Sequence, residues 1–142
     1  MGIAASVRFT GFISEAEKIA LLGQAAVVVN TSEKEGWGMT VIEGNACGTP
    51  NVSTNVPGLR DSVRDGETGL LTPYGDVNAL GDAVVRLLTD SQLRARMVER
   101  GLDWARRFSW DNVAADTLRL IDEAITPTGA DIRLVASPFQ SA

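Results

Sequence analysis

The sequence has no histidine among its 142 residues and only one cysteine, Cys47. The missing histidine excludes histidine-based general acid–base catalysis, Ser-His and Cys-His nucleophile pairs, and metal sites built on imidazole. A lone cysteine excludes an internal disulfide and a cysteine-rich zinc centre. We therefore expect no metal site in this chain.

Long apolar runs are also missing. No segment approaches the ~20 apolar residues of a membrane-spanning helix, and the start MGIAASVRF lacks the apolar core of a secretory signal. Acidic residues outnumber basic ones by 18 to 13, and the net charge of −5 gives no broad attraction to nucleic acid or an anionic membrane. A single cysteine fits a reducing compartment, so we expect a cytoplasmic location.

What the chain does contain is typical of a soluble globular protein, with 44% hydrophobic and 22% charged residues. Its length suffices for one domain with a substantial core. Apolar runs of strand length alternate with segments of helical periodicity, which predicts an α/β fold with a three-layer, Rossmann-like parallel sheet. We expect the domain over residues 1–125 and a tail over 126–142 that is loose or adds an edge strand at 132–135.

Start and stop signals place the individual elements. Strands are expected at residues 7–12, 25–29 and 51–54, with a further one ending at residue 71. Helices are expected after the capping box Ser14–Glu17, over 39–47, over one or two turns within 57–63, and after Asp76, Asp90 or Ser91, and Ser109. Apolar residues of the last helix that we expect to face inward are Val113, Leu118, Ile121 and Ile125, and we expect Trp104 and Trp110 in the core.

The loop Asn30–Gly38 is the best place for a ligand, since open α/β sheets bind ligands at the carboxyl ends of their strands. The loop leads into a helix, whose first amides lack partners and carry a partial charge of about +0.5. Gly36 and Gly38 let the backbone approach a ligand closely. An anionic group such as a pyrophosphate therefore fits here without a lysine.

Two carboxylates accompany this helix start. Glu35 lies just before the helix, and Glu43 lies on its second turn. A carboxylate can accept two hydrogen bonds from a vicinal diol, each contributing roughly 1.5–3 kcal/mol, so one could bind a ribose and the other a sugar. The spacing alone is common in unrelated sequences, where it marks a solvated helix face.

The residues around this pair resemble the hallmark segments of retaining GT-B glycosyltransferases of the family 4 type, over about residues 7–125. The similar segments are, in chain order, Phe9–Phe12, Glu35–Met39, Val41–Glu43, Ala46–Pro50, Pro57–Leu59, Asp65–Leu71 and Phe108–Trp110. The resemblance implies that residues 1–125 are the C-terminal, nucleotide-sugar-binding domain of such a protein, with its first strands missing.

In that family the first glutamate contacts the donor sugar, with a role that is mostly positional and electrostatic, and the second binds the ribose. The resemblance therefore implies Glu35 as the catalytic residue and Glu43 as the ribose ligand. The other substrate-binding residues that it implies are Gly36, Trp37, Gly38, Met39 and Thr40 at the sugar and pyrophosphate, and Phe12 and Ile13 beside the nucleobase. It implies transfer of a hexose from a nucleotide-sugar with retention, in a bacterial protein with no resident cofactor.

Parts of the family pattern have no counterpart in the sequence. The acceptor-binding domain is missing, as are the first strands, which carry an Arg and a Lys for the leaving diphosphate. Lys34 either compensates in part or is a solvated loop lysine. We expect the isolated chain to be inactive; the alternative is a truncated fragment that folds and self-associates without turnover. A phosphorylase with pyridoxal phosphate would need an active-site lysine, and neither Lys18 nor Lys34 lies in a suitable motif.

The missing strands are central ones in the family's sheet. The expected strand 7–12 would therefore lack a neighbour beside the strand 25–29. Either these two pair directly in a rearranged sheet, or a second copy supplies the edge, because an exposed central strand is a template for association. We expect a homodimer or a complementing chain as partner.

Four further residues have two possible interpretations or depart from the family. Trp37 either stacks on a sugar or base or packs inward, and Cys47 is either a reactive thiol or a small packed residue. Gly44 replaces the usual alanine, at a cost of about 1 kcal/mol inside a helix. Asn51 replaces the usual valine of a buried strand, so it needs a hydrogen-bond partner.

Overall fold

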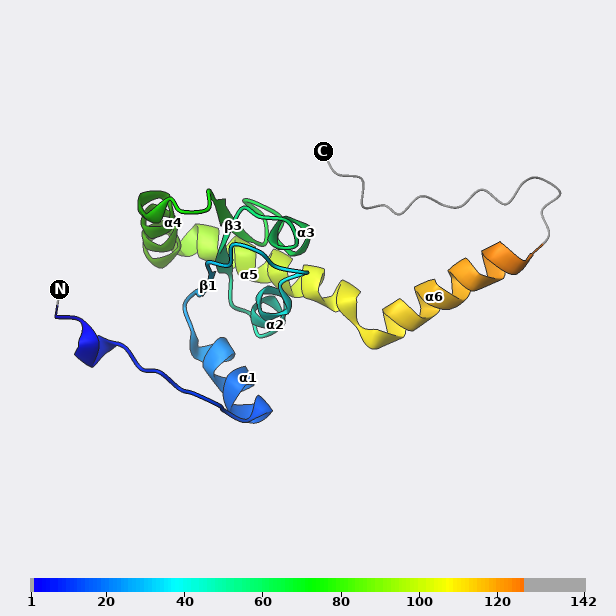
Figure 1. Cartoon of the computed structure of the whole chain (residues 1–142), viewed down its shortest axis with the longest axis horizontal. Coiled ribbons are helices and arrows are strands. Elements are labelled where there is room, and N and C mark those ends of the chain that lie inside the picture. Colours follow the sequence, from blue (N-terminus) through cyan, green and yellow to red (C-terminus); the bar gives the residue numbers. More distant parts are fainter. Residues whose placement is uncertain (1, 127–142) are drawn as a thin grey trace. The chain divides into compact units, whose positions relative to one another are not determined.

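The computed structural model describes residues 2–126 (Figure 1). In chain order the elements are the 3-10 helix η1 (Ala4–Ser6), α1 (Glu15–Gln24), β1 (Val28–Asn30), α2 (Met39–Ala46), β2 (Asn51–Thr54), α3 (Leu59–Ser62), β3 (Gly69–Thr72), α4 (Val77–Thr89), α5 (Ser91–Ala105), the 3-10 helix η2 (Arg106–Phe108) and α6 (Trp110–Ile125). Contacts group the chain into two compact units, Met1–Arg107 and one that begins at Phe108. The edge strand expected at 132–135 lies outside the described residues.

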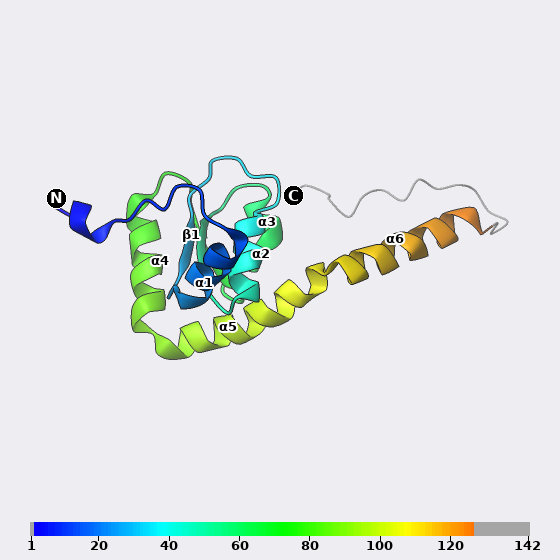
Figure 2. The same ribbon diagram turned by 90° about the horizontal axis from the view of Figure 1, so that it is seen from below.

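Three parallel strands in the order β1-β2-β3 form the centre of the first unit. Val28 of β1 lies beside Asn51 of β2, which lies beside Gly69 of β3. Figure 2 shows α4 on one side of the strands, α2 and α3 on the other, and α5 crossing below them. The arrangement is the parallel α/β sheet between helix layers that the sequence predicts.

Apolar side chains pack on both faces of this sheet. One cluster joins the strands to α4 and α5 and consists of Val52, Leu70, Leu87, Leu93 and Met97. The other joins α2 to the α3 region and consists of Val41, Val56, Leu59 and Val63, with Leu71 packed against it. Leu70 and Leu71 belong to different clusters because successive side chains of a strand point to opposite faces.

Residues 7–12 do not form the strand that their sequence predicts. The segment is irregular and exposed, and Phe9 is 93% exposed. A strand is stabilised by hydrogen bonds to a neighbouring strand, and within residues 2–126 no strand pairs with this segment. The expectation of a rearranged sheet, with 7–12 beside 25–29, is therefore wrong.

Strand β1 begins later than its apolar run suggests. It starts at Val28, and Val29 is 45% exposed. Ala25 and Ala26 are exposed too, so the run Ala25–Val29 is not covered on both faces as expected. As the first strand of the order, β1 also lies at an edge of the sheet. On the covered side α2 approaches closely, because a Cβ on Gly44 would lie 3.0 Å from Cγ2 of Val28.

Helix caps occupy their predicted places. The Ser14 hydroxyl accepts from the amide of Glu17 at 3.3 Å, and the Glu17 carboxylate accepts from the amide of Ser14 at 2.9 Å. The Ser14 amide, and then its hydroxyl, lower the pKa of Glu17 below its usual value. Side chains that accept from first-turn amides of α4, α5 and α6 are Asp76, Asp90 and Ser109.

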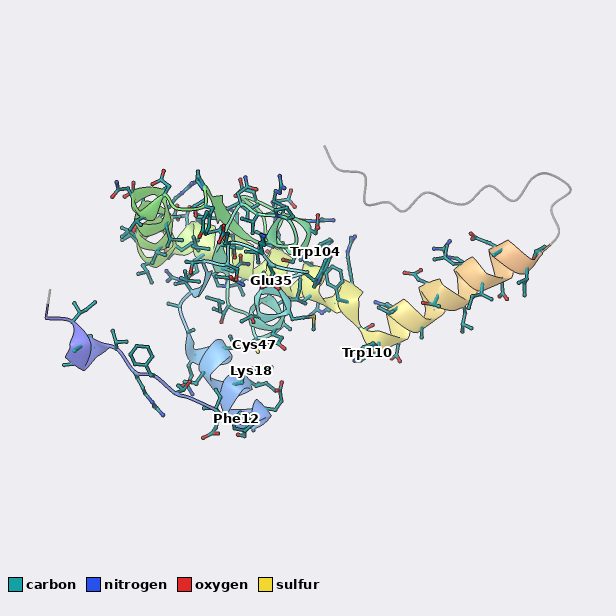
Figure 3. All side chains as sticks on the ribbon, viewed as in Figure 1. Phe12, Lys18, Glu35, Cys47, Trp104 and Trp110 are labelled. Carbon is teal, nitrogen blue, oxygen red and sulfur yellow. The ribbon has the colours of Figure 1, made fainter. Side chains whose placement is uncertain are left out.

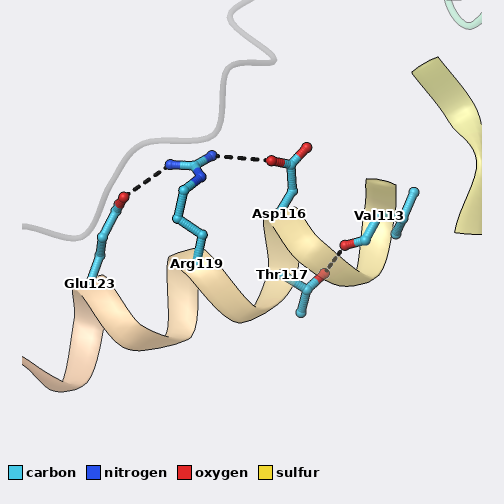
Figure 4. A network of polar contacts seen from close by, with 5 residues as sticks. All are labelled: Val113, Asp116, Thr117, Arg119 and Glu123. Atoms are coloured by element: carbon cyan, nitrogen blue, oxygen red, sulfur yellow. Dashed lines mark hydrogen bonds and ion pairs between the residues drawn. The ribbon is translucent and has the colours of Figure 1, made fainter. Parts of the chain in front are cut away.

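Helix α6 forms as predicted, but its apolar side chains are exposed. They include the four that we expected to face inward: Val113, Leu118, Ile121 and Ile125. Trp110 is exposed as well, so its expected place in the core is also wrong. Ion pairs support this helix locally, since Arg119 lies 3.0 Å from Glu123 and 3.5 Å from Asp116 (Figure 4). No other described element of this unit covers the apolar side.

Asn51 obtains the hydrogen-bond partners that a buried amide needs. Its Nδ2 donates to the carbonyl of Thr68 at 3.1 Å and to Oδ1 of Asn45 at 3.4 Å. Its Oδ1 accepts from the hydroxyl of Ser53 at 3.1 Å. A Cβ on Gly69 would strike this amide, so the glycine of β3 makes room for it.

We predict that Asn51→Ala lowers the free energy of unfolding by about 2–3 kcal/mol, because it removes these bonds and opens a cavity at a fully buried site. Urea denaturation measures the change. Asn55→Ala, at an exposed position next to the same strand, is the matched control and should change the value by less than about 0.5 kcal/mol. Equal effects of the two substitutions would contradict the prediction.

Candidate functional site

The loop between β1 and α2 is tied down where it leaves the sheet. The side chain of Asn30, the last residue of β1, accepts from the amide of Ser32 at 3.0 Å. The hydroxyl of Thr54, at the end of β2, donates to the carbonyl of Ser32 at 2.6 Å. The carboxyl ends of two neighbouring strands therefore hold the start of this loop.

The second half of the loop packs against the turn that starts α3. Gly58 has φ +84, and a Cβ there would strike the backbone carbonyl of Glu35. Gly38, also at φ +84, would place a Cβ 2.8 Å from Cδ2 of Leu59 and 2.9 Å from Oγ of Ser62. Both positions require glycine, for conformation and for space. This contact sets where Glu35 and the start of α2 lie.

Helix α3 is held in turn by α5. The indole Nε1 of Trp104 donates to the carbonyl of Ser62 at 2.8 Å, and the Arg64 guanidinium lies 3.9 Å from the centre of the indole ring. Trp104 is half-buried, so its expected place in the core is correct only in part. Sequence analysis missed this support of the loop, although Gly58 lies in one of the segments that it singled out.

The side chain of Glu35 is half-buried, and its Oε1 accepts from the amide of Gly36 at 3.0 Å. Glu35, labelled in Figure 3, precedes the start of α2, and its carbonyl lies against Gly58 at the start of α3. Among the described residues, Oε2 has no hydrogen-bond donor. One carboxylate oxygen is thus held by the loop itself, and the other is available to a ligand.

The start of α2 presents backbone amides to the same region. The carbonyl of Gly38 accepts from the amides of Val41 and Ile42, at 2.9 and 3.4 Å. The amides of Met39 and Thr40 precede the first intrahelical bond, so the helix offers them no acceptor. Both residues are exposed. An anionic group can be bound here by backbone donors.

Glu43 lies one helical turn further on and is already paired. Its Oε1 accepts from Nζ of Lys18 at 2.9 Å, and each side chain keeps about a third of its surface exposed. Nζ of Lys18 also lies 3.1 Å from Glu15. The hydrogen bond to Glu43, and then that to Glu15, raise the pKa of Lys18 above its usual value.

For the other residues predicted at the site, the structure gives the exposure of the side chain. Trp37 is half-buried and Lys34 is exposed. Phe12 is fully exposed and Ile13 half-buried, on the segment before α1, and Figure 3 shows Phe12 apart from Glu35. The place of both residues beside a nucleobase stays a prediction.

Within residues 2–126, no three His, Cys, Asp or Glu side chains lie together in a way that could hold a metal ion. None of the helices in that range has the length and apolar character to cross a membrane. Cys47 is half-buried after the last turn of α2.

Residues 1–104 match the family described as "Glycosyl transferases group 1". The phosphatidyl-myo-inositol mannosyltransferase of Mycobacterium leprae (strain TN) is 35% identical over 136 residues, which are 95% of this chain and 36% of that protein. A D-inositol 3-phosphate glycosyltransferase of Corynebacterium glutamicum (strain R) is also 35% identical, over 92% of this chain and 31% of its own. The chain thus spans about a third of the length of the curated relatives it matches.

Solved structures share the fold. Sucrose-phosphate synthase from Thermosynechococcus elongatus matches with a TM-score of 0.78 and 33% identity, over 85% of this chain and 31% of that one. Anabaena HepE, solved in complexes with UDP and with UDP-glucose, also matches with a TM-score of 0.78. At 24% identity over 86% of this chain and 34% of that one, this second likeness shows the fold alone.

We predict that Gly58→Ala destabilises the first unit by about 2 kcal/mol more than Gly66→Ala, because it overpacks the contact with the loop. Gly66 is the matched control: its φ is +73, and a Cβ there would meet nothing within 4 Å. Both substitutions carry the cost of a positive φ, but Gly58 also has ψ −53, outside the left-handed α region, so the difference reports the clash with Glu35 together with this extra backbone strain. Urea unfolding of the two variants measures it, and equal costs would show that the contact is loose.

Proposed function

The chain belongs to the glycosyl transferases group 1, with the GT-B type of α/β fold, and from that premise we propose that it binds the nucleotide-sugar donor of a retaining glycosyltransferase. The observation that carries the proposal is the loop before the open start of α2: the carboxyl ends of β1 and β2 hold it at Ser32, and Gly58 packs against it at Glu35. Family relatives that transfer mannosyl and glycosyl groups support it.

In this proposal the start of α2 binds the diphosphate. The amides of Met39 and Thr40 donate to its oxygens, and the helix dipole favours its charge. Gly36, Trp37 and Gly38 contact the sugar and pyrophosphate along the loop. That HepE, which shares the fold, is solved with UDP and with UDP-glucose is consistent with this ligand class.

The two carboxylates bind the two sugars of the donor. Glu35 accepts from hydroxyls of the transferred hexose through the oxygen that the loop leaves available, and its negative charge lies near the carbon where positive charge develops. Glu43 accepts from the ribose hydroxyls. Phe12 and Ile13 border the nucleobase once the segment before α1 closes over it. The chemistry needs no resident cofactor.

We further propose that residues 1–142 alone bind the donor without transferring its sugar. The chain spans about a third of its relatives' length, and an acceptor must be brought to the sugar by parts that the other two thirds supply. The acceptor is set by those parts as well.

A second candidate function is self-association without turnover. It is favoured by the edge position of β1, where Val29 is half-exposed and no described segment pairs. Because pairing with residues 7–12 does not occur, a second copy of the chain or a complementing chain remains as the partner that could cover this edge, and self-association commits to the second copy.

Isothermal titration of the full chain with UDP, GDP and ADP tests donor binding. We expect saturable binding of one of the three. Glu43→Gln should weaken this binding about 10- to 100-fold, because it removes the negative charge of the side chain that binds the ribose. Glu99→Gln, on an exposed position of α5, is the matched control and should leave the affinity unchanged. Absence of binding by all three nucleotides would refute the proposal.

The same titration separates the roles of the carboxylates. The second ligand is the nucleotide-sugar whose base is the preferred one. Glu35→Gln should lower the affinity for this nucleotide-sugar and leave the affinity for the nucleoside diphosphate unchanged, because only the nucleotide-sugar carries the hexose. A loss of both ligands alike would place Glu35 at the nucleotide instead.

Sedimentation velocity over a concentration series tests the second candidate. We expect the chain to dimerise and Val29→Lys to shift it to monomer, because a charge on an exposed edge strand opposes pairing. Val85→Lys, an equal change on the exposed side of α4, is the control and should leave the dimer intact. A monomer at every concentration would exclude association through β1.

A further inference from the structure

Helix α1 has no buried residue, although it carries several apolar ones. Two polar ties hold it to the rest of the unit. At its end the hydroxyl of Thr49 donates to the carbonyls of Leu22 and Ala25, at 2.6 and 3.3 Å. In its first half Lys18 bonds Glu43 of α2 at 2.9 Å. The position of α1 therefore depends on the same carboxylate that we assign to the ribose.

The bond to Lys18 occupies only one oxygen of that carboxylate. Nζ contacts Oε1, and no donor among the described residues contacts Oε2. An exposed glutamate otherwise changes rotamer freely, which costs conformational entropy when it must bind in one orientation. The bond from Lys18 to Oε1 restricts the rotamer of Glu43 and so the orientation of its Oε2.

Lys18 is itself restrained. Its ammonium lies 3.1 Å from Glu15, one turn earlier on α1, while it bonds Glu43. A long lysine side chain bonded at two carboxylates loses much of its freedom before any ligand arrives. The row Glu15–Lys18–Glu43 is thus a preformed support for one carboxylate oxygen.

We propose that Lys18 is a positioning residue that sets Glu43 for the 2′-hydroxyl of the donor ribose, and so determines preference for ribonucleotides over 2′-deoxyribonucleotides. This inference rests on the proposed function. A carboxylate held in one orientation distinguishes a ribonucleotide from its 2′-deoxy analogue by one hydrogen bond. A mobile carboxylate does so less well, because it can turn away from a ligand that lacks the hydroxyl. Lys18 itself touches neither the sugar nor the diphosphate.

The experiment compares two ligands in each protein. The full chain is titrated with the nucleoside diphosphate that it binds, of UDP, GDP and ADP, and with the 2′-deoxy analogue of that diphosphate. We expect the wild type to bind the ribonucleotide about tenfold more tightly than the 2′-deoxy analogue. Lys18→Met should reduce this ratio to less than about twofold, mainly by lowering the affinity for the ribonucleotide. Because the readout is a ratio within one protein, a partly unfolded fraction of a variant cancels.

Two variants complete the test. Lys18→Arg keeps a cation that reaches Glu43 and should retain most of the preference. Glu15→Gln removes the other partner of Lys18 without touching the bond to Glu43, and should lower the preference less than Lys18→Met does.

The outcomes distinguish a failure of donor binding from a failure of the role of Lys18. If the wild type binds no nucleotide, the proposed function fails and the role of Lys18 fails with it. If the wild type binds and discriminates while Lys18→Met keeps the tenfold ratio, or loses both ligands equally, donor binding stands and the positioning role is overturned. Equal loss of both ligands would indicate contact of Lys18 with the diphosphate or a purely structural role.

Discussion

The candidate site depends on a contact between two stretches of backbone, Gly58 at the start of α3 and the carbonyl of Glu35 in the loop. Main chain can touch main chain only where no side chain intervenes, so this contact requires glycine. From it follow the position of the Glu35 carboxylate and, through Gly38, the direction in which α2 starts. Trp104 extends the support to α5 by its bond to Ser62. These contacts fix the second half of the loop to the body of the first unit.

Polar groups support the second carboxylate. Helix α1 is joined to the unit by Thr49 at one end and Lys18 at the other, without any buried apolar residue. Such ties are weak individually because they are exposed to water. The bond between Lys18 and Glu43 thus links the position of α1 to the orientation of the second carboxylate.

Much of the fold follows from local patterns. The capping box at Ser14, the cap at Ser109 and strand β2 are where the sequence predicts them, since caps and short buried strands depend on residues a few positions apart. The resemblance to GT-B glycosyltransferases is confirmed by the family match over residues 1–104 and by the TM-score of 0.78. Positions assigned to Glu35 and Glu43 from that resemblance lie at the loop and on α2 as expected, while their roles stay predictions.

The sequence by itself determined where the six α-helices lie, though neither 3-10 helix, and that one loop concentrates glycine and carboxylate before a helix. Only the tertiary structure decided that residues 7–12 stay unpaired, that the apolar side of α6 is exposed, and that Glu43 is bonded to Lys18. Each of these outcomes depends on whether a partner distant along the chain is present or not. A local pattern records what a segment is able to form, whereas burial, strand pairing and ion pairing depend on whether another segment arrives beside it.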